Sequence, residues 1–446
     1  LTQLNTGTES FISYALGGWA APWGIEFRID LLNAYVLLLV TAIASLTLVY
    51  APRSVQREIP KDQQSGFYAA FLLALAGLLG ITATGDAFNV FVFLEVSSLA
   101  SYALISLGHD RRALNAAFQY LIMGTIGATF ILIGLGFIYM MTGTLNMADL
   151  AQRLPALHQT STVQTGFAFI SIGILLKLAM FPLHLWLPNA YAYAPSVVSI
   201  FLAATSTKVA IYLLVRFVFS VFNPEYAFEQ LALTYIVLPL AILAVLSASL
   251  VAIFQDNLKR MLAYSSVAQI GYILMGFALA SPAGLQAALL HLFNHALMKG
   301  ALFMALGAMA WHLGSVKLSA IGGLGKQMPY TMLAFVLGSI SLIGLPLTAG
   351  FISKWYLILA AMQQGWWWLV VIILIGSLLA AIYLWRVVEV AYFKPATSGK
   401  IVCEAPLSLL IPTWLLVFAN VYFGVETSLT VGVTGAAANH LFGVGL

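Results

Sequence analysis

Charged residues are scarce in this 446-residue chain, and cysteine is almost absent. Asp, Glu, Lys and Arg make up 8% of the sequence and hydrophobic residues 62%, whereas soluble domains carry roughly a quarter charged residues. This composition excludes a soluble globular protein. The single cysteine, Cys403, excludes an internal disulfide, a cysteine-bound iron–sulfur cluster and a cysteine zinc site. Any redox chemistry would therefore belong to a partner.

Nucleotide-binding motifs are missing as well. Gly325-Lys326 lacks the earlier glycine and the following Ser or Thr of a phosphate-binding loop, and no dinucleotide fingerprint follows a strand. We expect no bound cofactor, no catalytic chemistry in the chain itself, and energy from an ion gradient or an attached partner.

The net charge of +4 is small and its positive residues lie in short loops, so nucleic acid is excluded as a partner. The chain begins with Leu1 and residues 1–30 do not resemble a signal peptide, so we expect a missing upstream segment.

Hydrophobic runs long enough to cross a bilayer, about 20 residues each, recur from end to end. They predict a single membrane domain over residues 1–446. The domain should be an all-α polytopic membrane protein surrounded by lipid, because continuous apolar runs do not fit an outer-membrane barrel. Apolar length and Gly/Pro punctuation predict about twelve transmembrane helices. They lie near 31–50, 66–84, 87–108, 113–141, 166–187, 195–222, 231–254, 259–280, 284–311, 329–352, 366–393 and 406–425.

The basic residues test this assignment, because successive loops of a membrane protein should alternate in their Lys and Arg content. They do alternate. One set of loops holds Arg53, Arg57, Lys61, Arg111, Arg112, Lys259, Arg260, Lys317, Lys326, Lys394 and Lys400, and the other holds only Arg28 and Arg153. We expect the first set to face the cytoplasm of a bacterial cell. The protein would then lie in the inner membrane with both termini of this segment outside.

A few charged residues remain near the middle of predicted helices, and these are Glu95, Lys177, Lys208, Lys299 and Lys354. Each charge at the bilayer centre costs about 2.5–3.5 kcal/mol even on the lenient insertion scale, so together they approach the net stability of a whole domain. Charges retained at that cost predict a function. Ion translocation, and proton translocation above all, uses such residues.

Two halves of the chain resemble each other. Ser97–Gly108 is similar to Ser265–Gly276, and two predicted helices, 166–187 and 329–352, each carry a lysine and a Pro-Leu pair. Proline breaks the backbone ladder, and broken helices at corresponding places in two halves indicate a transport site. An odd number of predicted helices separates the copies, so the second copy should be inverted. We predict a first repeat over 66–222, a second repeat over 230–394 and a C-terminal helix region over 395–446.

Lys177 has apolar neighbours on both sides, and Glu95 is the one acid near mid-span that can stabilise its charged form. A lysine removed from water in this way can exchange protons near neutrality. A pair that opens and closes would modulate that exchange. Two structural alternatives remain open: a lysine bonded to the carbonyls freed at Pro182, and an ion pair that only stabilises the fold.

Lys208 and Lys354 can each be interpreted in two ways, as a member of a proton path or as a lysine near the end of a helix. Lys208 follows the hydroxyl-bearing residues Thr205–Thr207, which can carry a hydrogen bond or hold water. Its alternative, a helix-end lysine that reaches the surface, is weaker because Pro195 lies about 20 Å of helix away. Lys354, after Gly350–Ser353, is either a terminal exit group or a lysine at the end of a span. Its matching place in the repeat favours the exit group.

His291, His295 and Lys299 follow each other at intervals of four residues, so they stack on one face of a helix. That face is a candidate proton relay. A metal site is the rival interpretation, but no third ligand is evident and a lysine one turn away repels a cation, so we expect no metal. The third interpretation, histidines bonded within a packed interior, stays open, more for His291 than for His295.

At these residues the sequence resembles the proton-conducting antiporter-type subunits shared by Mrp cation/proton antiporters, respiratory complex I and membrane-bound hydrogenases. The resemblance covers essentially the whole chain. Besides the charged and histidine residues, it rests on Phe181–Pro188 and Gly350–Lys354. Within the family, Thr142–Leu150 and Ser353–Tyr356 are most similar to the D subunit of Mrp antiporters.

The resemblance implies two inverted five-helix repeats with broken helices, in a fold of about 14 helices of which about two would precede those found here. It also implies that Glu95, Lys177, Lys208, His295 and Lys354 carry the proton path, supported by His291 and Lys299. We therefore expect a proton-translocating subunit of a multi-subunit Na⁺/proton antiporter, with other membrane subunits as partners. Lysines would repel sodium, so its site would lie elsewhere. The alternative is the proton-pumping subunit of a redox complex, either NADH dehydrogenase-like or a membrane-bound hydrogenase.

Overall fold

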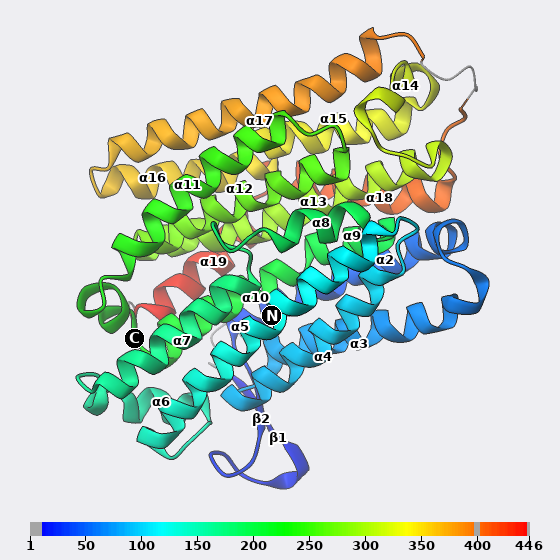
Figure 1. Ribbon diagram of the computed structural model, residues 1–446. Coiled ribbons are helices and arrows are strands. Elements are labelled where there is room, and N and C mark those ends of the chain that lie inside the picture. The colour runs from blue at the N-terminus through cyan, green and yellow to red at the C-terminus, as the bar shows by residue number, and fades with distance from the viewer. Residues whose placement is uncertain (1–10, 397–401, 444–446) are drawn as a thin grey trace.

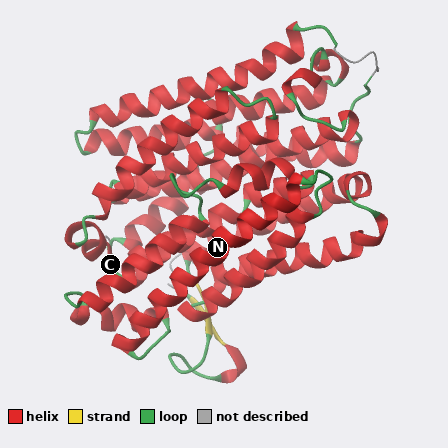
Figure 2. Cartoon of the chain, in the orientation of Figure 1, coloured by secondary structure: helices red, strands yellow, loops and turns green. Residues whose placement is uncertain are grey.

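Long helices run side by side in both directions through the computed structural model, which describes residues 11–396 and 402–443 (Figure 1). Helices dominate those residues, and the strands named in them are the two of one short antiparallel hairpin, β1 (Ile12–Ala15) and β2 (Glu26–Ile29) (Figure 2). Ten stretches of helix are long and apolar enough to cross a membrane. The chain is thus an all-α multi-pass membrane protein, as predicted.

Nine of these stretches are unbroken helices. They are α2 (Leu31–Glu58), α3 (Gln64–Ala83), α4 (Ala87–Ser106), α5 (Arg112–Thr142), α11 (Leu233–Ile253), α12 (Leu258–Ala278), α13 (Pro282–Leu313), α17 (Trp367–Phe393) and α18 (Leu407–Val425). Short elements connect or flank them: η1 (Leu16–Gly18), η2 (Lys61–Gln63), α6 (Met147–Arg153), η3 (Leu154–Leu157), the π-helical η5 (Tyr226–Gln230), η6 (Leu318–Ala320), α14 (Leu324–Gln327) and α19 (Ser428–Leu441).

Three crossings are interrupted. One joins α7 (Ser161–Lys177) to α8 (Trp186–Tyr193), and another joins α15 (Pro329–Ile343) to α16 (Ala349–Gln363). In the third, α9 (Ser196–Ala204) and α10 (Ser206–Val215) meet at Thr205 and continue into the π-helical η4 (Arg216–Val221). With the two pairs of shorter helices, the described residues make the twelve crossings that the sequence predicts.

The breaks that the prolines predict are present. The crossing predicted over 195–222 is confirmed at Ser196–Val221, with an interruption that the sequence did not predict, because Thr205 leaves the helical region with φ −124° and ψ −55°. The crossing predicted over 329–352 continues to Gln363, because the break between α15 and α16 lengthens the path of the chain across the membrane.

Loops rich in basic residues lie together at one end of the bundle, which we call the basic end. Arg57, Arg112, Lys259 and Lys317 line one cavity of about 650 Å³ there. Lys259 was predicted in a solvated loop, but it is buried at the start of α12 and donates to the Ala194 carbonyl at 3.2 Å. Lys400 lies outside the described residues.

At the other end, which we call the opposite end, Arg28 shares a cavity of about 420 Å³ with residues of α6, η4 and α19. Helix α3 starts at the basic end and α11 starts at the opposite end. Each therefore begins a set of five crossings whose fourth is broken, and the two sets run in inverted directions through the bundle (Figure 1). Which end faces the cytoplasm remains a prediction.

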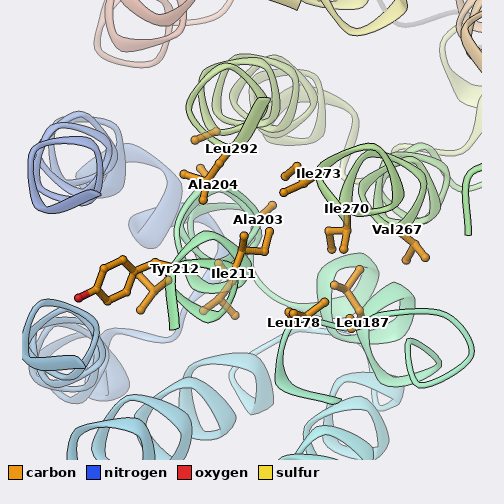
Figure 3. Packing of buried hydrophobic residues seen from close by; sticks show 14 of the residues in the cluster. Leu178, Leu187, Ala203, Ala204, Ile211, Tyr212, Val267, Ile270, Ile273 and Leu292 are labelled. Atoms are coloured by element: carbon orange, nitrogen blue, oxygen red, sulfur yellow. The ribbon is translucent and has the colours of Figure 1, made fainter. Parts of the chain in front are cut away.

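The crossings differ in how far the protein encloses them, and two of the most enclosed carry mid-span charges, Lys208 on the α9/α10 crossing and Lys299 on α13. In their most apolar stretches, 94% of residues are buried in α12, 89% in α9 to η4 and 78% in α13, against 33% in the outer helix α17. Figure 3 shows Ala203, Ala204 and Ile211 of the α9/α10 crossing among side chains of α12 and α13, such as Ile270 and Leu292. Polar groups on these crossings cannot face lipid and must find partners inside the protein.

Candidate functional site

All seven predicted site residues lie inside the bundle, and we call them the charged row. Their helices are α4 for Glu95, α7 for Lys177, α10 for Lys208, α13 for His291, His295 and Lys299, and α16 for Lys354. The lysines and histidines are almost fully buried, with at most 7% of each residue exposed. The Glu95 side chain is 25% exposed. The row therefore crosses both halves of the protein and reaches the outer surface of the bundle only at Glu95.

Lys177 ends α7 and forms a loose ion pair with Glu95. Its Nζ lies 3.7 Å from Glu95 Oε1 and donates a hydrogen bond to Ser98 Oγ at 2.8 Å. Oε1 of Glu95 is buried and has no hydrogen-bond partner among the described residues. A lysine bonded to freed backbone carbonyls is therefore not what forms here. The ammonium is held by a hydroxyl and one distant carboxylate oxygen, an arrangement that can open.

A small cavity extends from Lys177 toward the second lysine. It has a volume of about 30 Å³ and is lined by Lys177, Ser98, Tyr120 and Ser206. Most of the rest of its lining is apolar, but a cavity of that size can hold a water molecule, and these four side chains can bond to it. Water there would connect Lys177 to the hydroxyl-bearing turn that precedes Lys208.

Lys208 occupies the break between α9 and α10. The hydroxyl of Thr205 bonds back to the Phe201 carbonyl at 2.6 Å, and the Lys208 ammonium donates to the carbonyl of Ala203. Thr207 Oγ1 lies 3.5 Å away. Lysine at the C-terminal end of a helix is favoured by the helix dipole and by unpaired carbonyls. Because Lys208 has no exposed surface, the alternative of a lysine reaching the membrane surface is excluded.

The face of α13 holds two histidines in different surroundings. His291 has both ring nitrogens occupied, by Gln269 Oε1 at 2.9 Å and by Ser353 Oγ at 2.7 Å. Neither ring nitrogen of His295 has a hydrogen-bond partner among the described residues, although the two rings are nearly parallel at 6.1 Å. Buried nitrogens without partners cost free energy unless water satisfies them. His295 is thus the histidine that can accept or give up a proton.

Lys299 and Lys354 complete the row in the second half. Lys299 donates to the Leu262 carbonyl at 2.8 Å and to the Ser265 hydroxyl. Lys354 donates to the Leu342 and Ile343 carbonyls at 3.1 and 2.8 Å, which end α15 at the break.

Lys354 is therefore at a break in the interior and not at the end of a span, which excludes the second interpretation considered for it. It also donates to Ser377 Oγ at 2.9 Å. Its ammonium lies 4.8 Å from the centre of the Tyr272 ring, and that ring is 5.8 Å from His291. Lys354 is thereby connected to the histidine face.

Hydroxyl and amide partners are the part of the site that the sequence analysis did not identify as functional. Ser98, Ser265, Gln269, Ser353 and Ser377 each bond directly to a lysine or histidine of the row. The repeated Ser-Ser pair was a usable signal for two of them, because Ser98 and Ser265 belong to the segments that resemble each other. Gln269 and Ser377 had no comparable signal.

The charges of the row cannot all be present at once without mutual repulsion. The positive charges of Lys208 and Lys299 both disfavour a positive charge on His295. The charge of Lys208 also disfavours a positive charge on Lys299. Like charges in a poorly solvated interior repel strongly, so a proton bound at one site disfavours a proton at its neighbour. The arrangement can therefore pass a proton charge stepwise along the row.

Gly344 is the residue on which the position of Lys354 depends. It ends α15 with φ +91°, and a Cβ there would lie 2.8 Å from Cδ of Lys354. We expect Gly344→Ala to lower the free energy of unfolding by about 2–4 kcal/mol, through backbone strain and the clash. The thermal unfolding midpoint of the detergent-purified protein measures this loss.

Gly365→Ala is the matched control. Gly365 has a comparable φ of +73°, but a Cβ there meets nothing within 4 Å. Its substitution should therefore lower the free energy of unfolding only by the cost of the backbone strain. Equal losses for the two variants would contradict the contact with Lys354.

Comparison with known proteins supports this geometry. The family model described as "NADH:quinone oxidoreductase/Mrp antiporter, TM" matches residues 84–380. That range contains every residue of the charged row. A match over this much of the chain places the row inside the shared architecture of one family of membrane proteins.

Two curated relatives differ in their similarity. The chain is 46% identical to the N subunit of a NADH-quinone oxidoreductase from Desulforudis audaxviator, over 92% of this chain and 84% of that protein. It is 34% identical to the D subunit of a Na⁺/H⁺ antiporter from Alkalihalophilus pseudofirmus, over 78% and 69%. The predicted family is confirmed, whereas the finer assignment to the antiporter protein is not.

Two solved structures share the fold. A chain of an archaeal membrane-bound sulfane sulfur reductase superposes with a TM-score of 0.91 and 32% identity, covering 99% of this chain and 88% of that one. A chain of the Mrp complex from a Dietzia species gives 0.89 and 26%, covering 99% and 89%. Both structures are complexes by name, and the reductase is named a respiratory membrane complex.

Proposed function

Because this chain belongs to the NADH:quinone oxidoreductase/Mrp antiporter family of membrane subunits, we propose that it is the antiporter-like, proton-translocating subunit of a respiratory redox complex. The observation that carries the choice of complex is the 46% identity to a NADH-quinone oxidoreductase subunit, against 34% to an antiporter subunit. The similarity to a respiratory sulfur reductase complex points in the same direction. Redox centres would lie in partner subunits.

The charged row is the proposed proton path. Opening of the 3.7 Å pair removes the Glu95 carboxylate from Lys177, so the lysine holds its proton less strongly and releases it toward the water-sized cavity at Ser206. Lys208 takes up a proton from that side. Each transfer moves one proton from a donor nitrogen through water to an acceptor nitrogen. No other covalent bond of the chain is formed or broken.

His295 is the proposed link between the halves. It lies one helix turn before Lys299 on α13, and α13 packs against α10, which carries Lys208, so its neutral imidazole accepts a proton when one of those lysines gives it up. The Tyr272 ring lies near both His291 and the Lys354 ammonium, so Lys354 follows the histidines as the terminal group of the row. A charge displacement in a partner protein of the complex drives the row by opening the Glu95–Lys177 pair.

A Na⁺/proton antiporter is the second candidate, favoured by the likeness to an antiporter protein and to the Mrp complex. The row serves both functions, because it handles protons and its lysines repel sodium. In an antiporter the sodium site would lie in another subunit.

In either complex we propose that the basic end faces the cytoplasm, as the distribution of Lys and Arg favours.

Lys177→Ala tests the path. In vesicles that contain the intact complex, we expect proton translocation during turnover to fall about 10²-fold or more, because a positioned proton donor contributes at least that much. A pH-sensitive dye inside the vesicles measures the rate. Lys259→Ala is the matched control, since Lys259 is about as buried as Lys177 and also has a hydrogen-bond partner inside the protein, the Ala194 carbonyl, yet lies outside the row. Normal pumping by assembled Lys177→Ala complexes would contradict the proposal.

Purification of the native complex separates the two candidates. Iron–sulfur or nickel proteins that copurify with the chain are expected for a redox complex, together with pumping that depends on an electron donor. Small hydrophobic subunits alone, with proton movement that depends on sodium, would instead identify the antiporter.

A further inference from the structure

A second set of charged residues, outside the row, closes the opposite end of the α9/α10 crossing. Nη1 and Nη2 of Arg216 lie 2.7 and 2.8 Å from the two carboxylate oxygens of Asp30. The Arg216 side chain is 12% exposed and that of Asp30 18% exposed. Asp30 also accepts from the backbone N–H of Asn33 as the N-cap of α2. Nη2 thus donates a charge-assisted hydrogen bond to Asp30 and Nη1 adds a close ionic contact, and charge-assisted bonds are stronger than those between neutral groups.

This pair is connected to the charged row through one helix face. Lys208, Tyr212 and Arg216 follow each other at intervals of four residues, so they stack on the same side of the helix. Figure 3 shows the Tyr212 ring pointing away from the core residues of α12, toward the blue helices. Its hydroxyl donates to the Thr82 carbonyl at 3.0 Å and accepts from Arg216 Nε at 3.2 Å. Tyr212 is thus the polar group between Lys208 and the pair.

Beyond the pair lies open space. Asp30 and Arg216 line the cavity of about 420 Å³ at the opposite end, together with Arg28, Ser220 and His440. The helix changes from α to π geometry at Arg216 itself, and π segments are frequent at functional sites. Three observations therefore coincide at one residue: a close ion pair, a change of helix geometry and a place in the lining of a cavity.

We propose that Asp30 and Arg216 form the gate through which the charged row communicates with the opposite end, and that Tyr212 is the relay behind it. The proposal rests on the proposed proton translocation. In the structure the gate is closed, because both hydrogen-bonding roles of the Tyr212 hydroxyl are occupied. Arg216 also keeps its own protons, so while it is held by Asp30 it cannot accept a proton from Tyr212 and the path stays interrupted.

Opening of the gate frees Tyr212. When Arg216 moves toward the cavity, the Tyr212 oxygen can accept a proton through water from the Lys208 side and release its own hydroxyl proton to water on the cavity side. One proton enters and one leaves. Lys208 lies one helix turn, about 6 Å of rise, from Tyr212, and its ammonium bonds to Ala203 in the closed state. The path is therefore interrupted at both Lys208 and Arg216 until the gate opens.

Asp30→Asn is the first test, because it keeps the shape of the side chain and removes the charge that holds Arg216. In sealed vesicles with the intact complex and no turnover, we expect an imposed pH gradient to collapse about tenfold faster. A tenfold change requires ~1.4 kcal/mol, and removal of one partner of a buried pair exceeds that. Asp149→Asn is the matched control, since it breaks the exposed Arg153 pair at the same end.

Tyr212→Phe in the Asp30→Asn background separates a gate from a purely structural pair. If Tyr212 is the relay, the double variant returns to the wild-type leak; a leak caused by loosened packing would persist. A wild-type leak in assembled Asp30→Asn complexes, or a leak insensitive to Tyr212→Phe, overturns the proposal. If Asp30→Asn does not assemble, Arg216→Lys is judged by the same two criteria. Turnover is absent, so failure here leaves the Lys177 test of the proposed function unaffected.

Discussion

The ammonium groups of four lysines must be satisfied in an interior that supplies few oxygen atoms. In a regular helix every carbonyl already accepts a backbone hydrogen bond, so a lysine in the middle of a membrane-spanning helix finds few partners. This protein resolves the conflict by interrupting helices where the lysines need partners. Lys208 bonds to the end of α9, and Lys354 bonds to the end of α15. The breaks and the lysines therefore depend on each other.

Lys177 and Lys299 are satisfied differently, and the difference matters for transport. Both bond to serine hydroxyls that belong to the repeated Ser-Ser segments of α4 and α12. A hydroxyl can donate as well as accept, so it remains a partner when the lysine loses its proton. A carbonyl can only accept. Hydroxyl partners thus suit lysines that alternate between charged and neutral forms. Ser98 in α4 and Ser265 in α12 supply such a partner in each half, although Lys299 also donates to the Leu262 carbonyl and Lys354 also has a hydroxyl partner in Ser377.

Much of this arrangement can be read from the sequence, because charge in an apolar helix is a strong signal. The helical class, the number of crossings and the breaks near Pro182 and Pro346 follow from composition and punctuation, and the family follows from the resemblance that the site motifs carry. The break at Thr205 does not, since it contains neither Pro nor Gly and arises from a hydroxyl that bonds back to Phe201. The sequence also does not reveal which residues are buried by segments that lie far away along the chain. Lys259 has polar neighbours in sequence, yet a turn 65 residues away covers it, and the partner of Arg216 lies 186 residues away.

Two buried ion pairs of the protein differ in strength, and their chemistry explains why. Glu95 and Lys177 make one contact at 3.7 Å, whereas Asp30 and Arg216 make two, at 2.7 and 2.8 Å. Lysine can lose its proton when it is desolvated, and arginine cannot. A loose pair with a lysine suits a site where protons come and go, because little has to be broken for the proton to leave. A tight pair with an arginine suits a barrier, because its charge persists at any pH. The protein has the lysines within the row and the arginine where the row approaches water.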